Sequence, residues 1–304
     1  MVETGMAGSN AVRGWDIGRI LTWVLLIFLI IVTIFPLWVV LKTALTPTRE
    51  LFSSPLSLFP ENPTLFNFRR VLGLVSVEEN VAAGGSGQSI NFMRSVWNSV
   101  VFTTLVVVFQ TFFSALAAYA FARLKFIGRE IIFFLYLAAL MLPGAVLFLP
   151  NFVLIKNLGW LNTYVGMIAP FALMSPFAVF FLRQFFLSIP KELEEAAKLD
   201  GTSPFGTFWR IILPTSMTPI ATLVILTGIG AWNEFFWPYL VAGSSDTMRT
   251  LPVALQYFRT QTPQGSPDWT GLMAGTFLSI IPIFLLLIIL GRKVINSLQF
   301  SGLK

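Results

Sequence analysis

Six apolar stretches, each long enough to cross a lipid bilayer, constrain this chain more than any other feature. A bilayer core about 30 Å thick requires about 20 helical residues. Stretches of that length run over residues 17–41, 96–121, 131–155, 165–187, 218–241 and 271–290. Only 11% of the 304 residues are charged and 56% are apolar, whereas a water-soluble domain carries about 25% charged residues. The sequence therefore predicts an all-α membrane protein with six transmembrane helices.

The first stretch, residues 17–41, differs from a cleavable signal peptide. Its apolar run exceeds the roughly 7–15 residues of a signal sequence, and no small-residue cleavage site follows it. We therefore expect the stretch to be retained as a membrane span.

Basic residues in four regions predict the orientation of the spans. The regions lie before span one, between spans two and three, between spans four and five, and after span six. Their basic residues are Arg13, Arg19, Arg123, Lys125, Arg129, Arg183, Lys191, Lys198, Arg210, Arg292, Lys293 and Lys304. Short loops rich in Lys and Arg stay in the cytoplasm, so both termini are predicted to be cytoplasmic. The polar segment 43–94 is then an extracytoplasmic loop, in which residues 82–89 are typical of a flexible insertion.

What the chain lacks excludes several kinds of chemistry. Cys and His are absent, so disulfides, Cys/His zinc sites and catalytic Cys/His pairs cannot form. No phosphate-binding G-x-x-x-x-G-K-[ST] motif occurs. The spans are nearly free of ionisable residues, and Glu234 is the clear exception. Proton- or sodium-coupled transporters, in contrast, use ionisable residues inside the helix bundle as relays or ligands. We therefore expect no catalytic residue, no metal site and no bound cofactor, and the net charge of +6 indicates cytoplasmic loops rather than a nucleic-acid partner.

Two features of the spans each have two interpretations. Prolines interrupt several of the spans. They either kink a helix for packing or break it so that it lines a pathway. These prolines are Pro36, Pro143, Pro170, Pro176, Pro238 and Pro282. Neutral polar residues can bind a solute or a neighbouring helix, and they are Asn98, Gln110, Asn151, Gln184 and Asn233.

The connection between spans four and five predicts a helix, a turn and a second helix. Pro190 suits a first helical position, and Gly201 suits a left-handed helix end. Ser203 and Pro204 then favour the cap and first position of the second helix, which Pro214 closes. An acidic helix beside a membrane favours a protein partner, because helices that rest on lipid prefer a cationic polar face.

This connection resembles the EAA motif of the membrane subunits of bacterial binding-protein-dependent ABC importers. The family pattern is Glu-Ala-Ala, three residues, Gly, nine residues, Ile, one residue and Leu-Pro. The matching residues are Glu195, Ala196, Ala197, Gly201, Ile211, Leu213 and Pro214. Segments 141–143, 158–164, 190–193, 232–238 and 249–252 are similar to carbohydrate permeases, in particular the smaller six-span partner of the maltose-type pair. The similarity covers about residues 15–300, apart from an insertion near 75–88 and the tail 298–304.

The resemblance implies a type I ABC importer permease fold in the bacterial cell membrane. It divides the chain into an N-terminal span and loop (1–91), a core permease domain (92–291) with a coupling helix at about 189–213, and a cytoplasmic tail (292–304). The implied function is the non-enzymatic passage of a sugar or oligosaccharide. The implied partners are an ATP-binding-cassette ATPase dimer that uses ATP and Mg, a second homologous permease, an extracytoplasmic sugar-binding protein and membrane lipid.

Two groups of site residues follow from the resemblance. Those expected to couple to the ATPase are Glu194, Glu195, Ala196, Ala197, Gly201, Ile211, Leu213 and Pro214. Those expected along the substrate pathway are Trp232, Asn233 and Glu234. The outward loop 243–270 is expected to contact the binding protein. The alternatives are an importer for another polar solute such as glycerol-3-phosphate, and a stand-alone channel or secondary carrier.

Overall fold

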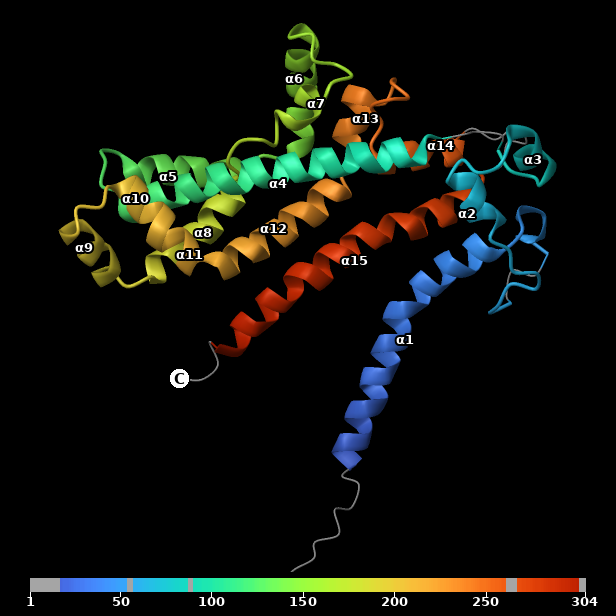
Figure 1. The fold of residues 1–304 in the computed structure, drawn as a ribbon, viewed down its shortest axis with the longest axis horizontal. Helices are drawn as coiled ribbons and strands as arrows, with labels where there is room; N and C mark the ends of the chain where they lie inside the picture. Colours follow the sequence, from blue (N-terminus) through green and yellow to red (C-terminus); the bar gives the residue numbers. More distant parts are fainter. Residues whose placement is uncertain (1–16, 54–56, 87–89, 261–266, 301–304) are drawn as a thin grey trace, which may run out of the picture.

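Three long helices form the frame of the protein (Figure 1). The computed structural model describes residues 17–53, 57–86, 90–260 and 267–300, and the regular secondary structure in these ranges is helical. Within them α1 (Ile17–Leu45), α4 (Phe92–Arg123) and α15 (Trp269–Phe300) are long and apolar enough to cross a membrane. They contain predicted spans one, two and six, and α15 continues into the residues expected to form a separate tail.

The other three predicted spans are broken helices. Span three is α5 (Arg129–Ala138), a 3-10 turn (Ala139–Met141) and α6 (Gly144–Asn157), bent by 98° at Leu142 and Pro143. Span four is α7 (Tyr164–Ile168) and α8 (Pro176–Ser188), and span five is α12 (Met217–Trp232) and α13 (Phe236–Ala242). Pro143, Pro170 and Pro176 lie at these breaks, where a missing N–H weakens the helix. These three prolines therefore interrupt helices, whereas Pro36 and Pro282 lie inside the continuous helices α1 and α15.

Shorter helices connect α4 to α15. Helix α4 packs along α8 and α12, and α15 packs against α12, α14 (Leu251–Thr260) and α1. In Figure 1, α1 diverges from the remaining helices away from its contact with α15 and α2. Its side chains from Ile17 to Leu37 are all exposed, so this apolar surface requires lipid or another protein.

The polar segment between α1 and α4 is folded, although its sequence predicts an irregular loop. It contains α2 (Phe66–Val71) and α3 (Val77–Ala82). The Ser76 hydroxyl caps α3 by accepting the Glu79 N–H at 3.2 Å. Figure 1 places α2 beside the end of α1 and the start of α15, with α3 farther out.

A buried ion pair between Arg70 and Asp268 joins this segment to α15. Both side chains are 1% exposed, and the second Arg70 nitrogen donates to Asp268 Oδ1 at 2.7 Å. Arg70 also donates to Asn80 Oδ1 at 3.1 Å, while the Ser86 N–H donates to Asp268 Oδ2 at 3.1 Å. Asn80 and Ser86 lie in the segment expected to be an insertion, near 75–88, and both contribute groups to this network.

Gly85 permits the insertion to close over the ion pair. A Cβ atom at this position would lie 1.9 Å from Asn80 Oδ1 and 2.4 Å from an Arg70 nitrogen. Such separations are well below van der Waals contact, so a side chain there would displace the network. The close approach therefore requires a residue without a side chain at position 85.

Candidate coupling site and membrane pathway

The predicted helix–turn–helix is present at one end of the helix bundle. Its first helix is α9 (Glu192–Leu199), and its second runs from Pro204 to Thr215 as α10 (Pro204–Thr207), a π-helical turn (Phe208–Ile212) and α11 (Leu213–Thr215). The second helix meets α12 at a bend of 78°. A proline at position 214 cannot donate an N–H to the preceding turn, which accounts for the π-helical geometry there.

The local turn chemistry agrees with the sequence prediction. Gly201 adopts a left-handed φ of 77° directly after the C-terminal cap of α9. The Ser203 hydroxyl accepts the Gly206 N–H at 3.2 Å, and Pro204 is the first residue of the second helix. The helix start differs from expectation, because α9 begins at Glu192 rather than at Pro190.

The two faces of α9 have different neighbours. Glu194 and Ala197 are buried against the rest of the chain, whereas Glu195 and Ala196 are exposed. Leu199 lies at the same helical stripe as these exposed residues and is 89% exposed. The exposed surface of α9 therefore combines acidic and small residues with two apolar side chains, those of Leu193 and Leu199.

Arg123 holds the buried face of α9 to the end of α4. Its Nε lies 2.9 Å from Glu194 Oε1, and the two side chains are only 4% and 10% exposed. The two atoms pair by charge without hydrogen-bond alignment. A terminal nitrogen of Arg123 also donates to the carbonyls of Phe186 and Ile189 at the end of α8. One guanidinium thus joins α4, α8 and α9.

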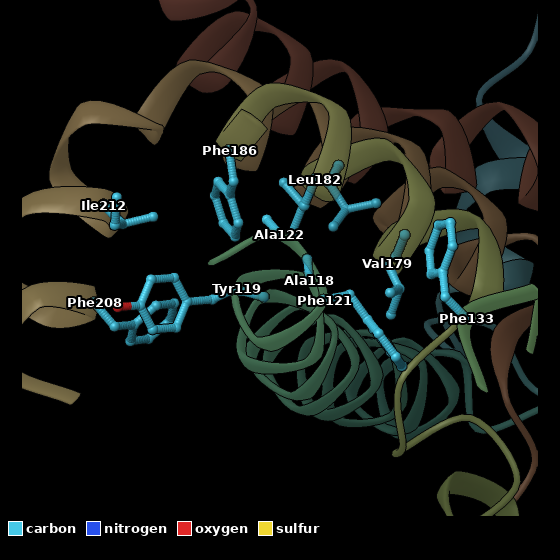
Figure 2. Packing of buried hydrophobic residues seen from close by; sticks show 13 residues of the cluster. Ala118, Tyr119, Phe121, Ala122, Phe133, Val179, Leu182, Phe186, Phe208 and Ile212 are labelled. Carbon is cyan, nitrogen blue, oxygen red and sulfur yellow. The ribbon is translucent and has the colours of Figure 1, made fainter. Parts of the chain in front are cut away.

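The second helix is anchored by the largest group of buried apolar residues near α9, which we call the α4–α8 cluster. Figure 2 draws this cluster and labels Ala118, Tyr119, Phe121, Ala122, Phe133, Val179, Leu182, Phe186, Phe208 and Ile212. The ring centroids of Tyr119 and Phe208 are 5.4 Å apart. Ile211 and Leu213 are half-buried and Pro214 is exposed, so these three residues belong to the link with α12 rather than to the exposed face of α9.

The three expected pathway residues point in different directions. Trp232 is 6% exposed, and its indole N–H donates to the Ser279 carbonyl of α15 at 3.1 Å. Asn233 is exposed, and its amide donates to the Ile229 carbonyl at 2.9 Å. Glu234 and Trp232 line two separate cavities, since Glu234 faces the space beside Phe102 and Gln110 while Trp232 faces one between α4, α12 and α15. Sequence adjacency therefore does not keep these three side chains together, because each faces a different side of the α12–α13 break.

The cavity at Glu234 lies between α4, α12 and the connection from α7 to α8. Its volume is about 230 Å³. It is lined by Phe102, Val106, Gln110, Phe171, Thr227, Gly230, Ala231 and Glu234. The sequence indicates Gln110 as a polar residue of the spans, but it does not single out Thr227, because a threonine in an apolar helix is not distinctive by itself. In the part of the chain that the structure describes, no group of three or more Asp, Glu, His or Cys side chains is placed to hold a metal ion.

Comparison with known proteins identifies the family. Residues 110–298 match the family model described as binding-protein-dependent transport system inner membrane component. The chain is 37% identical over 290 residues to the arabinooligosaccharides transport system permease protein AraQ of Halalkalibacterium halodurans, covering 94% of this chain and 97% of that protein. It is 32% identical to AraQ of Bacillus subtilis (95% and 97% covered) and 32% identical to the sn-glycerol-3-phosphate transport system permease protein UgpE of Escherichia coli (91% and 94% covered).

A solved structure shows the same fold. It is a bacterial ABC transporter involved in the import of the acidic polysaccharide alginate, with a TM-score of 0.75, 21% identity and coverage of 95% of this chain and 99% of that one. The chain thus belongs to the inner-membrane permeases of binding-protein-dependent ABC importers. It is a multi-pass, non-catalytic subunit that binds no cofactor itself, and the ATPase of the transporter is a separate subunit.

Proposed function

We propose that this permease passes a neutral sugar or short oligosaccharide. The observation that supports this cargo most directly is the cavity at Glu234, whose lining includes a carboxylate and no Lys or Arg. A phosphorylated solute is stabilised by cationic groups, and a carboxylate disfavours it. Two of the relatives are named for arabinooligosaccharide transport, although one at 32% identity is named for glycerol-3-phosphate.

Uptake by the assembled importer tests the cargo. The complete transporter and its binding protein would be reconstituted in proteoliposomes and supplied with labelled arabinooligosaccharide or labelled glycerol-3-phosphate. We expect ATP-dependent uptake of the neutral compound only. Uptake of glycerol-3-phosphate alone would overturn the proposed cargo and favour the alternative solute.

We further propose that α9 is the coupling helix that docks on the ATPase. Glu195 would pair with a basic residue, Ala196 would permit close approach, and Leu199 would enter an apolar recess. Glu194 and Ala197 would hold the helix to this chain, and Gly201 would provide the turn. Ile211, Leu213 and Pro214 would carry the motion of α9 into α12, because they lie on the helix that joins the two.

Reversing the charge of Glu195 tests this docking surface. Glu195→Lys should weaken ATPase binding about tenfold, the effect of losing an interfacial charge pair of about 1.4 kcal/mol. ATPase bound to the purified permease would be titrated by fluorescence, and uptake measured in parallel. Glu78→Lys is the matched control, since it makes the same charge change on the exposed surface of α3. Gly201→Asp should likewise uncouple hydrolysis from transport, and normal coupling in both α9-region variants would refute the docking role.

We propose six membrane passes with both termini in the cytoplasm. The family and the three continuous helices support a multi-pass chain, and the broken helices would provide the remaining passes. The natural chain contains no Cys, so single cysteines can be introduced without a background. An impermeant maleimide added outside intact spheroplasts should label Ser76→Cys and leave Lys198→Cys unlabelled until the membrane is opened. Outside labelling of Lys198→Cys would contradict this topology.

We also propose that the chain assembles with an ATPase dimer, a second homologous permease and an extracytoplasmic sugar-binding protein. The exposed apolar side chains of α1 support a protein or lipid neighbour along that helix. Tagged chain purified from its native membrane in mild detergent should bring the ATPase and a second permease, identified by mass spectrometry. Recovery of the folded chain alone would contradict this assembly.

A further inference from the structure

The cavity beside Glu234 contains polar groups that the protein itself leaves without partners. Among the described residues, the half-buried Gln110 amide of α4 and the half-buried Thr227 hydroxyl of α12 make no hydrogen bond. Glu234 uses one carboxylate oxygen to accept the Trp237 N–H at 3.1 Å. Polar groups in an apolar surrounding are costly unless paired. These three groups are therefore available to a hydrated or hydroxyl-rich occupant.

Helix periodicity brings the three groups to one place. Phe102, Val106 and Gln110 follow one another at intervals of four on α4. Thr227, Gly230 and Ala231 share a face of α12 at intervals of three and four residues. Glu234 follows the end of that helix and lines the same cavity. Because α4 and α12 pack along each other, their polar groups line a common space at different depths.

Two phenylalanines complete the wall of this space. The rings of Phe102 and Phe171 meet edge to face, with centroids 6.0 Å apart and an interplanar angle of 87°. Aromatic carbon next to an amide, a hydroxyl and a carboxylate matches a sugar ring, which has an apolar C–H face and a rim of hydroxyls. By contrast, Asn98 is buried and fully engaged, since it donates to the carbonyls of Thr247 and Arg249 and accepts the Tyr164 hydroxyl.

We infer that this cavity is a hydroxyl-binding subsite for one ring of a neutral sugar on its way through the membrane, with Gln110, Thr227 and Glu234 as its hydrogen-bonding groups. The inference rests on the proposed cargo and locates a contact on this subunit. The volume of about 230 Å³ is below the roughly 300–1,000 Å³ of pockets for drug-sized ligands, which favours a single ring. The Glu234 carboxylate accepts hydroxyl hydrogens and disfavours an anionic cargo.

Uptake kinetics of conservative variants test the subsite. In the reconstituted importer, Gln110→Leu and Thr227→Val should each lower uptake of a neutral oligosaccharide about tenfold, which corresponds to about 1.4 kcal/mol. ATP hydrolysis stimulated by the binding protein, and co-purification of the second permease, should be unchanged. Gln184→Leu is the matched control, because this glutamine is exposed on α8 and lines no part of the cavity.

Glu234→Gln tests the charge separately from the shape. This variant should raise uptake of an oligosaccharide containing a uronic acid relative to a neutral one of equal length, because the repulsive carboxylate is gone. An unchanged ratio would remove Glu234 from the subsite.

The outcomes separate the subsite from the proposed cargo. Wild-type uptake of the neutral sugar tests the cargo, while the ratio of variant to wild-type uptake tests the subsite. Wild-type rates in both Gln110→Leu and Thr227→Val would overturn it. Loss of the second permease from the Gln110→Leu complex would also overturn it, since Gln110 would then be a contact between subunits.

Discussion

Replacing Arg123 by methionine uncouples ATP hydrolysis from transport. The guanidinium joins three elements, because it pairs with Glu194 of α9 at 2.9 Å and donates to two carbonyls at the end of α8. Removing it leaves a buried carboxylate without its partner, which costs about 3–5 kcal/mol. The contact that is weakened is the one between α9 and α4. We therefore expect α9 still to bind the ATPase but to transmit little motion to α4.

The measurement is the number of sugar molecules transported per ATP hydrolysed, in proteoliposomes containing the complete importer. We expect a decrease of at least tenfold in this ratio for Arg123→Met. Arg129→Met is the matched control, because Arg129 pairs with Glu130 at a partly exposed site where an ion pair contributes about 0–1 kcal/mol. Its ratio should stay within twofold of the wild type.

Removing the charges singly and together distinguishes a loss of coupling from simple misfolding. Glu194→Gln keeps the size of the side chain, removes the charge and should reduce the ratio less than Arg123→Met does. The double variant Arg123→Met with Glu194→Leu removes both buried charges and should recover part of the coupling lost in Arg123→Met. Equal defects in the single and double variants, with no recovery, would argue against a direct pair between these residues.

Replacing Asp268 by asparagine destabilises the opposite end of the helix bundle. Arg70 is 1% exposed and would keep its charge without a counter-ion, at a cost of about 3–5 kcal/mol. The Gly271 N–H at the start of α15 would also lose the charged acceptor that it contacts at 3.0 Å. We expect the midpoint of thermal unfolding, followed by circular dichroism in detergent, to fall by several degrees.

Asp246→Asn provides the matched control for that measurement. Asp246 pairs with Arg249, but its side chain is 84% exposed, so its loss should cost about 0–1 kcal/mol. A midpoint for Asp268→Asn equal to that of the control would contradict a stabilising role for the buried pair.

The same pair predicts how stability depends on pH. Burial alone raises the pKa of Asp268, but hydrogen bonds from Arg70, its positive charge and the N–H groups of Gly271 and Ser86 together lower that pKa below its usual value. A carboxyl with a lowered folded-state pKa contributes stability above its unfolded pKa of about 3.9. This contribution is lost as the pH falls below that value through the folded-state pKa. The wild type should therefore lose stability over this acidic range, and Asp268→Asn should lose less.

Local chemistry made the helix–turn–helix predictable. A glycine with φ of 77° at position 201 and the Ser203 cap act over three or four residues, so the sequence alone indicates them. The continuous spans were predictable for a similar reason, since about 20 apolar residues satisfy the bilayer without reference to other helices.

Contacts between distant residues were not predictable in the same way. Arg123 and Glu194 belong to different helices, and the sequence analysis assigned Glu194 to the docking face and Arg123 only to the basic loop charge. Residues 82–89 were expected to be flexible, yet the Ser86 N–H joins Asn80 in completing the network around Arg70 and Asp268. A charge that is buried away from water requires an opposite charge nearby. Tertiary packing, and not the local sequence, decides which residue supplies it.

Properties that depend on neighbouring residues or on average hydropathy were determined by the sequence, and properties that depend on contacts between helices were determined by the tertiary structure. Apolar length, loop charge and the EAA spacing by themselves determined that this is a membrane-spanning permease with a helix–turn–helix connection. Only the tertiary structure decided that Trp232 packs on α15 while Glu234 joins Gln110 at a cavity. It also decided which face of α9 is exposed. The bilayer accepts any apolar face, so side-chain direction within a span is set by packing between helices and not by hydropathy.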